Sequence, residues 1–330
     1  MPAAGRNGSG KDELVKKLII GSRGSKLALW QAEKVKAMLI DKVDGLEIEI
    51  RIIKTSGDAR HDLSPGAFGT EGIFTAELDR ALKEREIDMA VHSLKDLPTK
   101  LEPGLTVAAV SSRASIEDLF LVREDHAAKT RPSSADDIAA LGKLTVGTSS
   151  LRRVALLKNR FPELEFAPMR GNLDTRVRKL GEGEYDAIVV AKAGMDRLEV
   201  DTGAHGVITL SPEWYLPAAG QGALAIETAD EGDGFETAKV LDHPETRAAV
   251  TAERVAMSAL GAGCRVPAGF LADIVDGKLK VRGIVGHPDG EPLVRAETEG
   301  DPADAEDIGR KLAEELKKLG ATDILKEVRG

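Results

Sequence analysis

The chain has 330 residues, of which 42% are hydrophobic, and this is enough to bury the cores of two or three domains. Its net charge of −9 and its aromatic content of 3% disfavour a nucleic-acid-binding protein, which would more often present a basic face with stacking aromatics. No run of about 18 apolar residues occurs, so we expect no membrane span.

Residues 1–16 are Gly-rich and polar and lack the apolar core of a signal peptide, so we expect a disordered leader. The single cysteine, Cys264, excludes an internal disulfide and suits a reducing cytoplasm. The six histidines are scattered without paired ligand spacing, so no metal site is expected.

The first predicted elements are a strand at 17–20, a helix at 27–40 and a strand at 46–52. Arg23 and Ser25 lie at the entrance of this helix, where free backbone N–H groups attract anions. A plain N-cap by Ser25 explains the same residues equally well.

A long Gly-rich stretch at 55–72 is expected to be a mobile flap or disordered, and an amphipathic helix follows at 73–84. Alternating strands and helices in this part indicate a mainly parallel sheet.

The segment MAVHSLKDLP, residues 89–98, combines a short buried strand with polar residues at its carboxyl end. Ser93, Lys95 and Asp96 fall at this edge, which is where open α/β sheets bind ligands. An ordinary surface turn with a Lys-Asp pair is the alternative. The interpretation as a site depends on how the rest of the chain surrounds this carboxylate with arginines.

A further strand is predicted at 105–110, followed by a domain boundary near 111–116. The chain then passes through the apolar residues 119–122 to a polar stretch at 123–137. A strand at 144–147 then leads through TSSLRR into a helix that ends near residue 159.

Two arginines in the first turn of that helix, Arg152 and Arg153, face the positive end of the helix dipole. Such a placement costs roughly 0.3–1 kcal/mol each when exposed. The hydroxyl groups of Thr148, Ser149 and Ser150 lie at the same point. The pattern therefore favours an anion site over two solvated arginines.

Two more strand ends carry arginine: Arg170 and Arg176 follow a strand at 165–169, and Arg197 follows one at 186–191. Each charged hydrogen bond to a carboxylate contributes about 1.5–3 kcal/mol. We therefore expect a polyacid ligand in a cleft between two α/β domains, rather than arginines that are simply frequent on surfaces.

Residues 214–225 contain GQGALA, with Gln221 and Gly222, but no strand precedes it as a nucleotide fingerprint requires. A hinge or crossover back to the first domain is the better interpretation. The acidic, Gly-rich residues 230–234 are expected to be a linker.

A helix is predicted at 244–260, with proline at its start and Gly261 as its stop. Cys264 follows in a loop of small residues beside a cation, which favours thiolate, although a buried structural thiol is the usual fate of a lone cysteine. Turn signals within 270–299 predict a three-stranded antiparallel meander, covered by a helix at 303–319.

From about Leu18 to its C-terminus the chain resembles the porphobilinogen deaminases. VHSLKDLP, GTSSLRR, RGNLDTR, LPAAGQGAL and GAGCRVP all occur in the order and spacing of that family. The resemblance implies an α/β fold of three domains: two periplasmic-binding-protein-like α/β domains with a cleft between them, and a small α+β C-terminal domain with a three-stranded antiparallel sheet. We expect domain 1 at 17–112 and 218–238, domain 2 at 113–217, and domain 3 at 239–330.

The resemblance also implies the reaction: four porphobilinogen molecules are deaminated and joined head to tail into hydroxymethylbilane, in tetrapyrrole biosynthesis. A dipyrromethane primer is joined by a thioether to a cysteine that matches Cys264, and the catalytic aspartate matches Asp96. The implied contacts with substrate and cofactor are Arg23, Ser25, Ser93, Lys95, Thr148, Ser149, Ser150, Arg152, Arg153, Arg170, Arg176, Arg197, Gln221 and Gly222. We expect a cytoplasmic monomer whose partner is this small substrate, without nucleic acid, membrane or metal.

One departure from the family is that residues 67–72 contain none of the lysines that family members commonly carry in this stretch. A non-catalytic binding protein for a polycarboxylate would share the two-domain cleft, but it would not need Cys264. A nicotinamide enzyme is disfavoured because the glycine fingerprint is absent.

Overall fold

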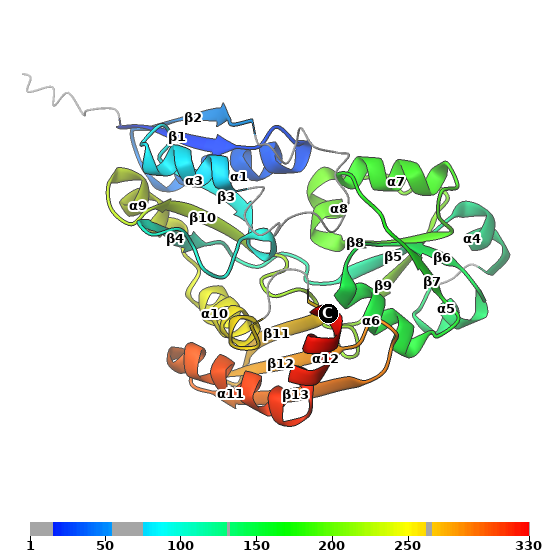
Figure 1. The fold of residues 1–330 in the computed structure, drawn as a ribbon. Helices are drawn as coiled ribbons and strands as arrows, with labels where there is room; N and C mark the ends of the chain where they lie inside the picture. Colours follow the sequence, from blue (N-terminus) through cyan, green and yellow to red (C-terminus); the bar gives the residue numbers. More distant parts are fainter. Residues whose placement is uncertain (1–15, 55–74, 131–132, 262–265, 330) are drawn as a thin grey trace, which may run out of the picture.

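The computed structural model describes residues 16–54, 75–130, 133–261 and 266–329, and three sheets organise them (Figure 1). The predicted flap at 55–72, with its lysine-free stretch, and the predicted attachment residue Cys264 lie outside the described residues.

The first sheet has the strand order β2-β1-β3-β10-β4. Its first three strands are parallel, and β10 is antiparallel to both of its neighbours, β3 and β4. The strands are β1 (Lys16–Ser22), β2 (Leu46–Ile52), β3 (Met89–Ser93), β4 (Leu105–Val110) and β10 (Leu224–Ala229). The helices packed with them are α1 (Lys26–Lys42), α3 (Ala76–Lys83) and α9 (Asp233–Ala238) (Figure 1).

The second sheet repeats this plan with the order β7-β6-β8-β5-β9, in which β6, β7 and β8 are parallel and β5 is antiparallel to both neighbours. Its strands are β5 (Asp118–Val122), β6 (Thr145–Gly147), β7 (Glu165–Ala167), β8 (Ala187–Ala191) and β9 (Gly206–Leu210). Its helices are α4 (Glu124–Thr130), α5 (Asp136–Ala140), α6 (Leu151–Arg160), α7 (Leu173–Gly181) and α8 (Lys192–Leu198).

The C-terminal part is an antiparallel sheet in the order β11-β12-β13, and α10 and α11 pack against it (Figure 1). Asp276 and Gly277 join β11 to β12 with φ of 52° and 74°, the positive values that a two-residue hairpin turn requires. The elements are α10 (Pro244–Ala259), β11 (Ala268–Val275), β12 (Lys278–Gly286), β13 (Leu293–Gly300), α11 (Ala305–Lys318) and α12 (Ala321–Arg329).

Two chain connections, residues 111–117 and 211–223, join the first two sheets, and a buried carboxylate of α10 holds both. Glu253 is 0% exposed and accepts hydrogen bonds from Arg113 Nη1 at 2.6 Å and from the backbone N–H of Gly220 at 2.7 Å. It also accepts from the N–H of Ala272 on β11 at 2.8 Å. The C-terminal part therefore fastens the region where the chain crosses between the sheets.

The predicted fold class, two α/β units and a small α+β unit with a three-stranded antiparallel sheet, is confirmed. The return of the chain to the first sheet is also confirmed, since β10 lies between β3 and β4. The domain limits given above remain our proposal.

Several elements were not predicted. The polar stretch 123–137 contains helix α4 and the start of α5. The strands β5, β9 and β10 and the helices α7, α8 and α12 were not predicted. Helix α9 begins inside the proposed linker, at Asp233. Strand β1 begins at Lys16, which had been assigned to the leader.

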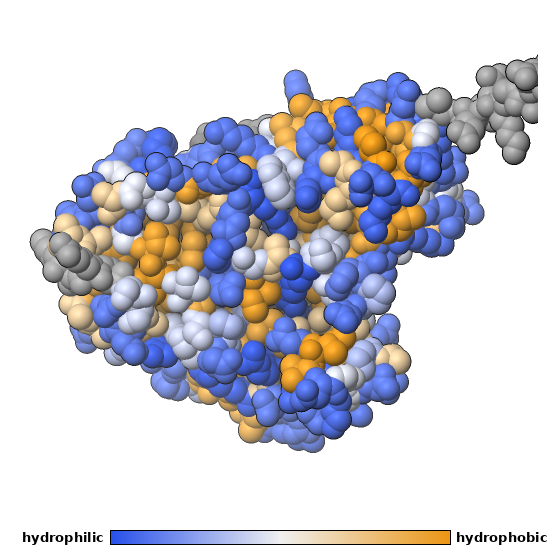
Figure 2. Space-filling model, turned by 180° about the vertical axis from the view of Figure 1, so that it is seen from behind, coloured by the Kyte–Doolittle hydropathy of each residue, from blue (hydrophilic) through white to orange (hydrophobic). Residues whose placement is uncertain are grey.

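Within the part of the chain that the structure describes, no helix combines the length and the apolar character needed to cross a membrane. Figure 2 shows hydrophilic residues over most of one face, with hydrophobic residues in smaller areas between them.

Candidate functional site

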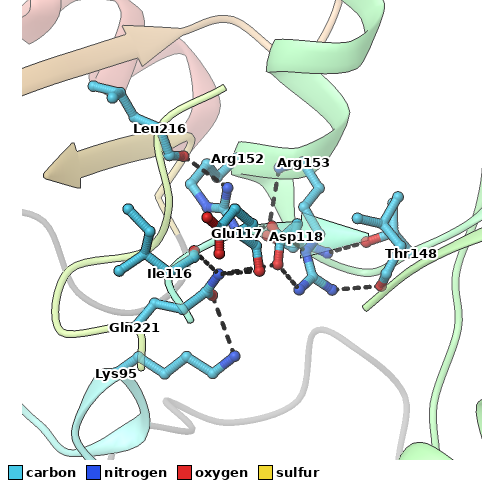
Figure 3. Close-up of polar contacts among 11 residues, drawn as sticks. Lys95, Ile116, Glu117, Asp118, Thr148, Arg152, Arg153, Leu216 and Gln221 are labelled. Atoms are coloured by element: carbon cyan, nitrogen blue, oxygen red, sulfur yellow. Dashed lines mark hydrogen bonds and ion pairs between the residues drawn. The ribbon is translucent and has the colours of Figure 1, made fainter. Parts of the chain in front are cut away.

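Gln221, in the connection from β9 to β10, joins the end of β3 to the second sheet (Figure 3). Its side-chain oxygen accepts a hydrogen bond from Lys95 Nζ at 3.3 Å. Its amide nitrogen donates to Ile116 O at 2.7 Å and to Asp118 Oδ1 at 3.1 Å. Because Gln221 is only 1% exposed, these bonds are shielded from water and fix the two units beside each other.

Asp118, the first residue of β5, is the partner of both arginines at the start of α6. Its Oδ2 lies 2.7 Å from Arg152 Nη2, and its Oδ1 lies 2.7 Å from Arg153 Nη2. All three residues are buried, with exposures of 1%, 4% and 6%. Burial alone would raise the pKa of Asp118, but the positive charges of Arg153 and Arg152 hold it well below its ordinary value of 3.8.

The carboxylate of Asp118 is thus one anion at the site predicted between the start of α6 and the guanidinium groups. The remaining guanidinium donors go to backbone carbonyls, from Arg152 to Leu216 O at 2.8 Å and from Arg153 to Val189 O at 2.6 Å. The alternative of two solvated arginines is wrong, because both side chains are buried. One carboxylate balances only one of the two positive charges, so the pair still favours further anions nearby.

Lys95 and Asp96 lie in a short 3-10 turn (η1, Leu94–Asp96) that follows β3 directly. Asp96 is exposed and Lys95 is half-buried. Burial lowers the pKa of Lys95, and the charge of Asp96 opposes this shift. The turn thus presents a carboxylate to solvent beside a partly desolvated ammonium group.

Ser93, at the end of β3, is held by a residue that sequence reasoning missed. Its hydroxyl accepts a hydrogen bond of 2.7 Å from the amide of Gln31 on α1, and Gln31 is 3% exposed. A polar residue on the buried face of α1 is the signal that could have found it.

The three hydroxyl residues before α6 make local bonds. Ser150 is the N-cap and accepts from the N–H of Arg153 at 3.5 Å. Thr148 accepts from the N–H of Ser150 at 3.2 Å. Ser149 both donates to Met169 O at 2.9 Å and accepts from Met169 N–H at 3.0 Å, which ties the start of α6 to the end of β7.

Of the other predicted arginines, Arg176 is associated with this charged cluster. It is half-buried and donates from Nε to Gly171 O at 2.9 Å. Burial lowers its pKa, the positive charge of Arg153 adds to this effect, and Asp96 opposes it.

Arg197 lies elsewhere on the boundary between the two units. It donates to Gly222 O at 2.7 Å, and its guanidinium lies 5.8 Å from the ring centre of Trp30 on α1. Arg23 follows β1 and is half-buried, and Arg170 lies exposed before α7. Ser25 is the N-cap of α1 and accepts from the N–H of Ala28 at 3.3 Å, as the capping alternative predicted.

Gly222 has a structural reason to be glycine. Its φ is +93°, and a Cβ atom there would lie 2.6 Å from the carbonyl oxygen of Ala114 in the other connection. The two connections therefore approach each other more closely than any side chain would allow.

The cluster as a whole has more positive than negative charge. Lys95, Arg152, Arg153 and Arg176 act on one another together with the carboxylates of Asp96 and Asp118. Among residues 16–54, 75–130, 133–261 and 266–329, no group of His, Cys, Asp and Glu could hold a metal ion. The cluster is thus suited to a ligand that carries several carboxylates.

Comparison with known proteins gives two family matches. Residues 18–237 match the family model "Porphobilinogen deaminase, dipyromethane cofactor binding domain", and residues 247–318 match "Porphobilinogen deaminase, C-terminal domain". The porphobilinogen deaminases of Nitrosomonas europaea and Chromobacterium violaceum are both 42% identical, over 94% of this chain and 97% and 98% of theirs. That of Ralstonia nicotianae is 44% identical, over 94% of this chain and 91% of its own length.

Proposed function

The chain belongs to the porphobilinogen deaminase family, and from this premise we propose that the charged cluster around Gln221 carries the reaction of that family. The enzyme is a transferase of tetrapyrrole biosynthesis. It releases ammonia from each of four porphobilinogen molecules and joins them head to tail into hydroxymethylbilane.

The surplus of positive charge at the ends of β3 and α6 carries this proposal. Four cationic side chains act there with only two carboxylates. Every porphobilinogen unit brings two carboxylates, so a growing chain needs more cations with each addition. This cluster also fits the dipyrromethane cofactor, which, attached to Cys264, supplies the pyrrole that the first substrate joins.

Asp96 is proposed as the catalytic residue. Its carboxylate is exposed at the carboxyl edge of the first sheet, beside Lys95 and within the field of Arg176. The reacting pyrrole rings of the substrate pass through electron-poor, cationic states, and a fixed carboxylate stabilises positive charge that develops next to it. The same group can accept and return the proton that the departing amine requires.

Lys95, Arg176, Arg152 and Arg153 are proposed to bind acetate and propionate groups. Burial lowers the pKa of both Lys95 and Arg176, so a ligand carboxylate beside either one would offset the cost of its desolvated charge. Arg152 and Arg153 act on the ligand through a field that Asp118 only partly cancels.

The remaining contacts are proposed from the family resemblance together with their positions. They are Arg23, Ser25, Ser93, Thr148, Ser149, Ser150, Arg170, Arg197, Gln221 and Gly222. Arg197 lies in the last turn of α8, and the others lie at a strand end, at a helix entrance or in a connection between the sheets.

We also propose that the protein works in the cytoplasm as a monomer. A single cysteine suits a reducing compartment. Among the described residues, the exposed large hydrophobic side chains are scattered over different elements, namely Ile40, Ile52, Val207, Val240, Val275 and Leu319. Sedimentation equilibrium would test the monomer.

The test of the proposed function is a single-substrate assay. Purified protein mixed with porphobilinogen should release ammonia and form hydroxymethylbilane. The variant Asp96→Ala should lose turnover by about 100- to 1000-fold, the range for removing one preorganised electrostatic group. Asp125→Ala, which removes an exposed acid on α4, should retain wild-type turnover. Equilibrium binding of substrate without ammonia release would instead support a binding protein.

A further inference from the structure

Helix α10 makes direct contact with the turn that presents Lys95 and Asp96. Arg254, near the C-terminal end of this helix, donates from Nη1 to Leu97 O at 2.9 Å and from Nη2 to Pro98 O at 2.6 Å. A longer contact of 3.4 Å joins Nη1 to Leu94 O. One guanidinium group thus bonds the carbonyls on both sides of Lys95 and Asp96.

The turn is anchored by two buried side chains, Leu94 and Leu97, each 1% exposed, but few of the described backbone hydrogen bonds hold it. Within it, the only backbone hydrogen bond described runs from Leu97 N–H to Leu94 O at 3.2 Å, and Leu94 N–H donates to Ala223 O at 3.0 Å. A cavity of about 220 Å³ lies between the turn and α10, lined in part by Leu94, Thr99, Val250 and Arg254. Packing thus holds the apolar side of the turn through Leu94 and Leu97, and the guanidinium bonds fix its carbonyl groups against α10.

We propose that Arg254 is a positioning residue for the reaction: it sets the position of the Asp96 carboxylate from the C-terminal part of the chain. The proposal rests on the proposed function, because it assumes that Asp96 acts on the substrate. Its neighbour Glu253 holds both connections between the sheets through Arg113 and Gly220. Two adjacent residues of α10, Glu253 and Arg254, therefore hold the connections between the sheets and the turn, respectively.

The same helix leads at its C-terminal end to the segment that contains Cys264. Along the chain, the residue proposed to carry the primer therefore follows the helix that holds the turn. A displacement of about 1 Å at a reacting group can cost on the order of 100-fold in rate, so a positioning residue outside the site can have a large effect.

The variants Arg254→Met and Arg254→Lys test this, with Arg247→Met as a matched control. Arg247 lies two turns earlier on α10. It also donates to backbone carbonyls, of Val107 and Ala108 on β4, and pairs with Asp242, and none of its described hydrogen bonds goes to the turn. Arg254→Met should lower kcat by about 10- to 100-fold with KM changed less than about threefold. Arg254→Lys should recover part of kcat, and Arg247→Met should keep wild-type kcat within about twofold.

Hydrogen exchange supplies a readout that does not depend on turnover. The amides of residues 94–99 should exchange faster in Arg254→Met than in the wild type, and they should be unchanged in Arg247→Met. Equal kcat and equal exchange in the two methionine variants would overturn the proposal. If Arg254→Met does not fold, Arg254→Lys decides: a kcat lowered about three- to tenfold at wild-type stability supports the proposal, and an unchanged kcat overturns it.

A wild-type protein that releases no ammonia would refute the proposed function, and the exchange experiment would still report whether Arg254 holds the turn. Conversely, loss of turnover in Asp96→Ala with normal turnover in Arg254→Met would leave the proposed function intact and remove the positioning role.

Discussion

The substitution Asp118→Asn should unfold the protein more easily, because it leaves two buried guanidinium groups with no carboxylate. The side chain of Asp118 is 0% exposed and accepts from Arg152 at 2.7 Å, from Arg153 at 2.7 and 3.2 Å, and from Gln221 at 3.1 Å. Asparagine has the same shape but carries no charge, and one of its two acceptors becomes a donor that faces a cation.

The magnitude follows from the burial of the three groups. Removing one partner of a buried ion pair costs about 3–5 kcal/mol, because the remaining charge is left without compensation. Here Asp118→Asn should lower the free energy of unfolding by that amount at pH 7. The control Asp125→Asn breaks the ion pair between Arg123 and Asp125, in which the Asp125 side chain is 55% exposed. It should lower the free energy of unfolding by about 0–1 kcal/mol.

The assay is urea denaturation at several pH values, followed by circular dichroism. Folding lowers the pKa of Asp118 from its ordinary 3.8, so its contribution to stability is fully present above pH 3.8 and is lost as the pH falls toward the folded pKa. The difference between the wild type and Asp118→Asn should therefore be largest near pH 7 and shrink below pH 3.8. A difference below about 1 kcal/mol at pH 7, equal to that of Asp125→Asn, would refute this reasoning.

Two further substitutions test other parts of the account. Burial and the charge of Glu227 raise the pKa of Asp79 to about 6, so the folded state loses stability as the pH rises from 3.8 to about 6. In thermal melts, Asp79→Asn should therefore increase the free energy of unfolding by about 1–2 kcal/mol at pH 7, after allowance for the half-exposed side chain, and should leave it unchanged at pH 3.5. Gly222→Ala should lower the free energy of unfolding by about 1–3 kcal/mol, since φ is +93° and the new Cβ would lie 2.6 Å from Ala114 O. The control is Gly45→Ala, where φ is +68° but the space is open; equal denaturation midpoints for the two variants would show that the close approach is unimportant.

Local signals predicted helix α10 and the hairpin between β11 and β12 in the C-terminal part. Helix α10 starts with Pro244 and stops before Gly261, whose φ is +63°, as the proline and glycine signals indicated. The hairpin between β11 and β12 turns at Asp276 and Gly277, a dipeptide that favours such turns and lies within the stretch where turn signals were noted. These signals lie within a few residues of the structure that they determine.

The strands that were missed depend on distant partners. Strand β10 is completely buried and pairs with β3 and β4, whose residues lie more than 100 positions earlier. It contains Glu227, which is 1% exposed and lies 3.0 Å from His92 Nε2, so its polar residues concealed a buried strand. No local pattern reports that such a charge has a partner on the neighbouring strand.

The site was predicted only in part, because some of its contacts also join residues that are distant in the sequence. The sequence analysis identified the turn at Lys95 and Asp96 and the paired arginines of α6, because each lies at a strand end or helix entrance. It did not identify Asp118 as the partner of Arg153, since the two residues lie 35 positions apart and meet only when β5 is placed in the second sheet. Sequence position therefore gave the charge of each group but not its nearest counter-charge.

Intact mass spectrometry of the purified protein, beside the variant Cys264→Ser, tests the central claim most directly. We predict that the active wild-type protein is heavier than its sequence by two pyrrole units, and that Cys264→Ser has the bare mass and no turnover. A wild-type protein with the bare mass and full production of hydroxymethylbilane would contradict the account.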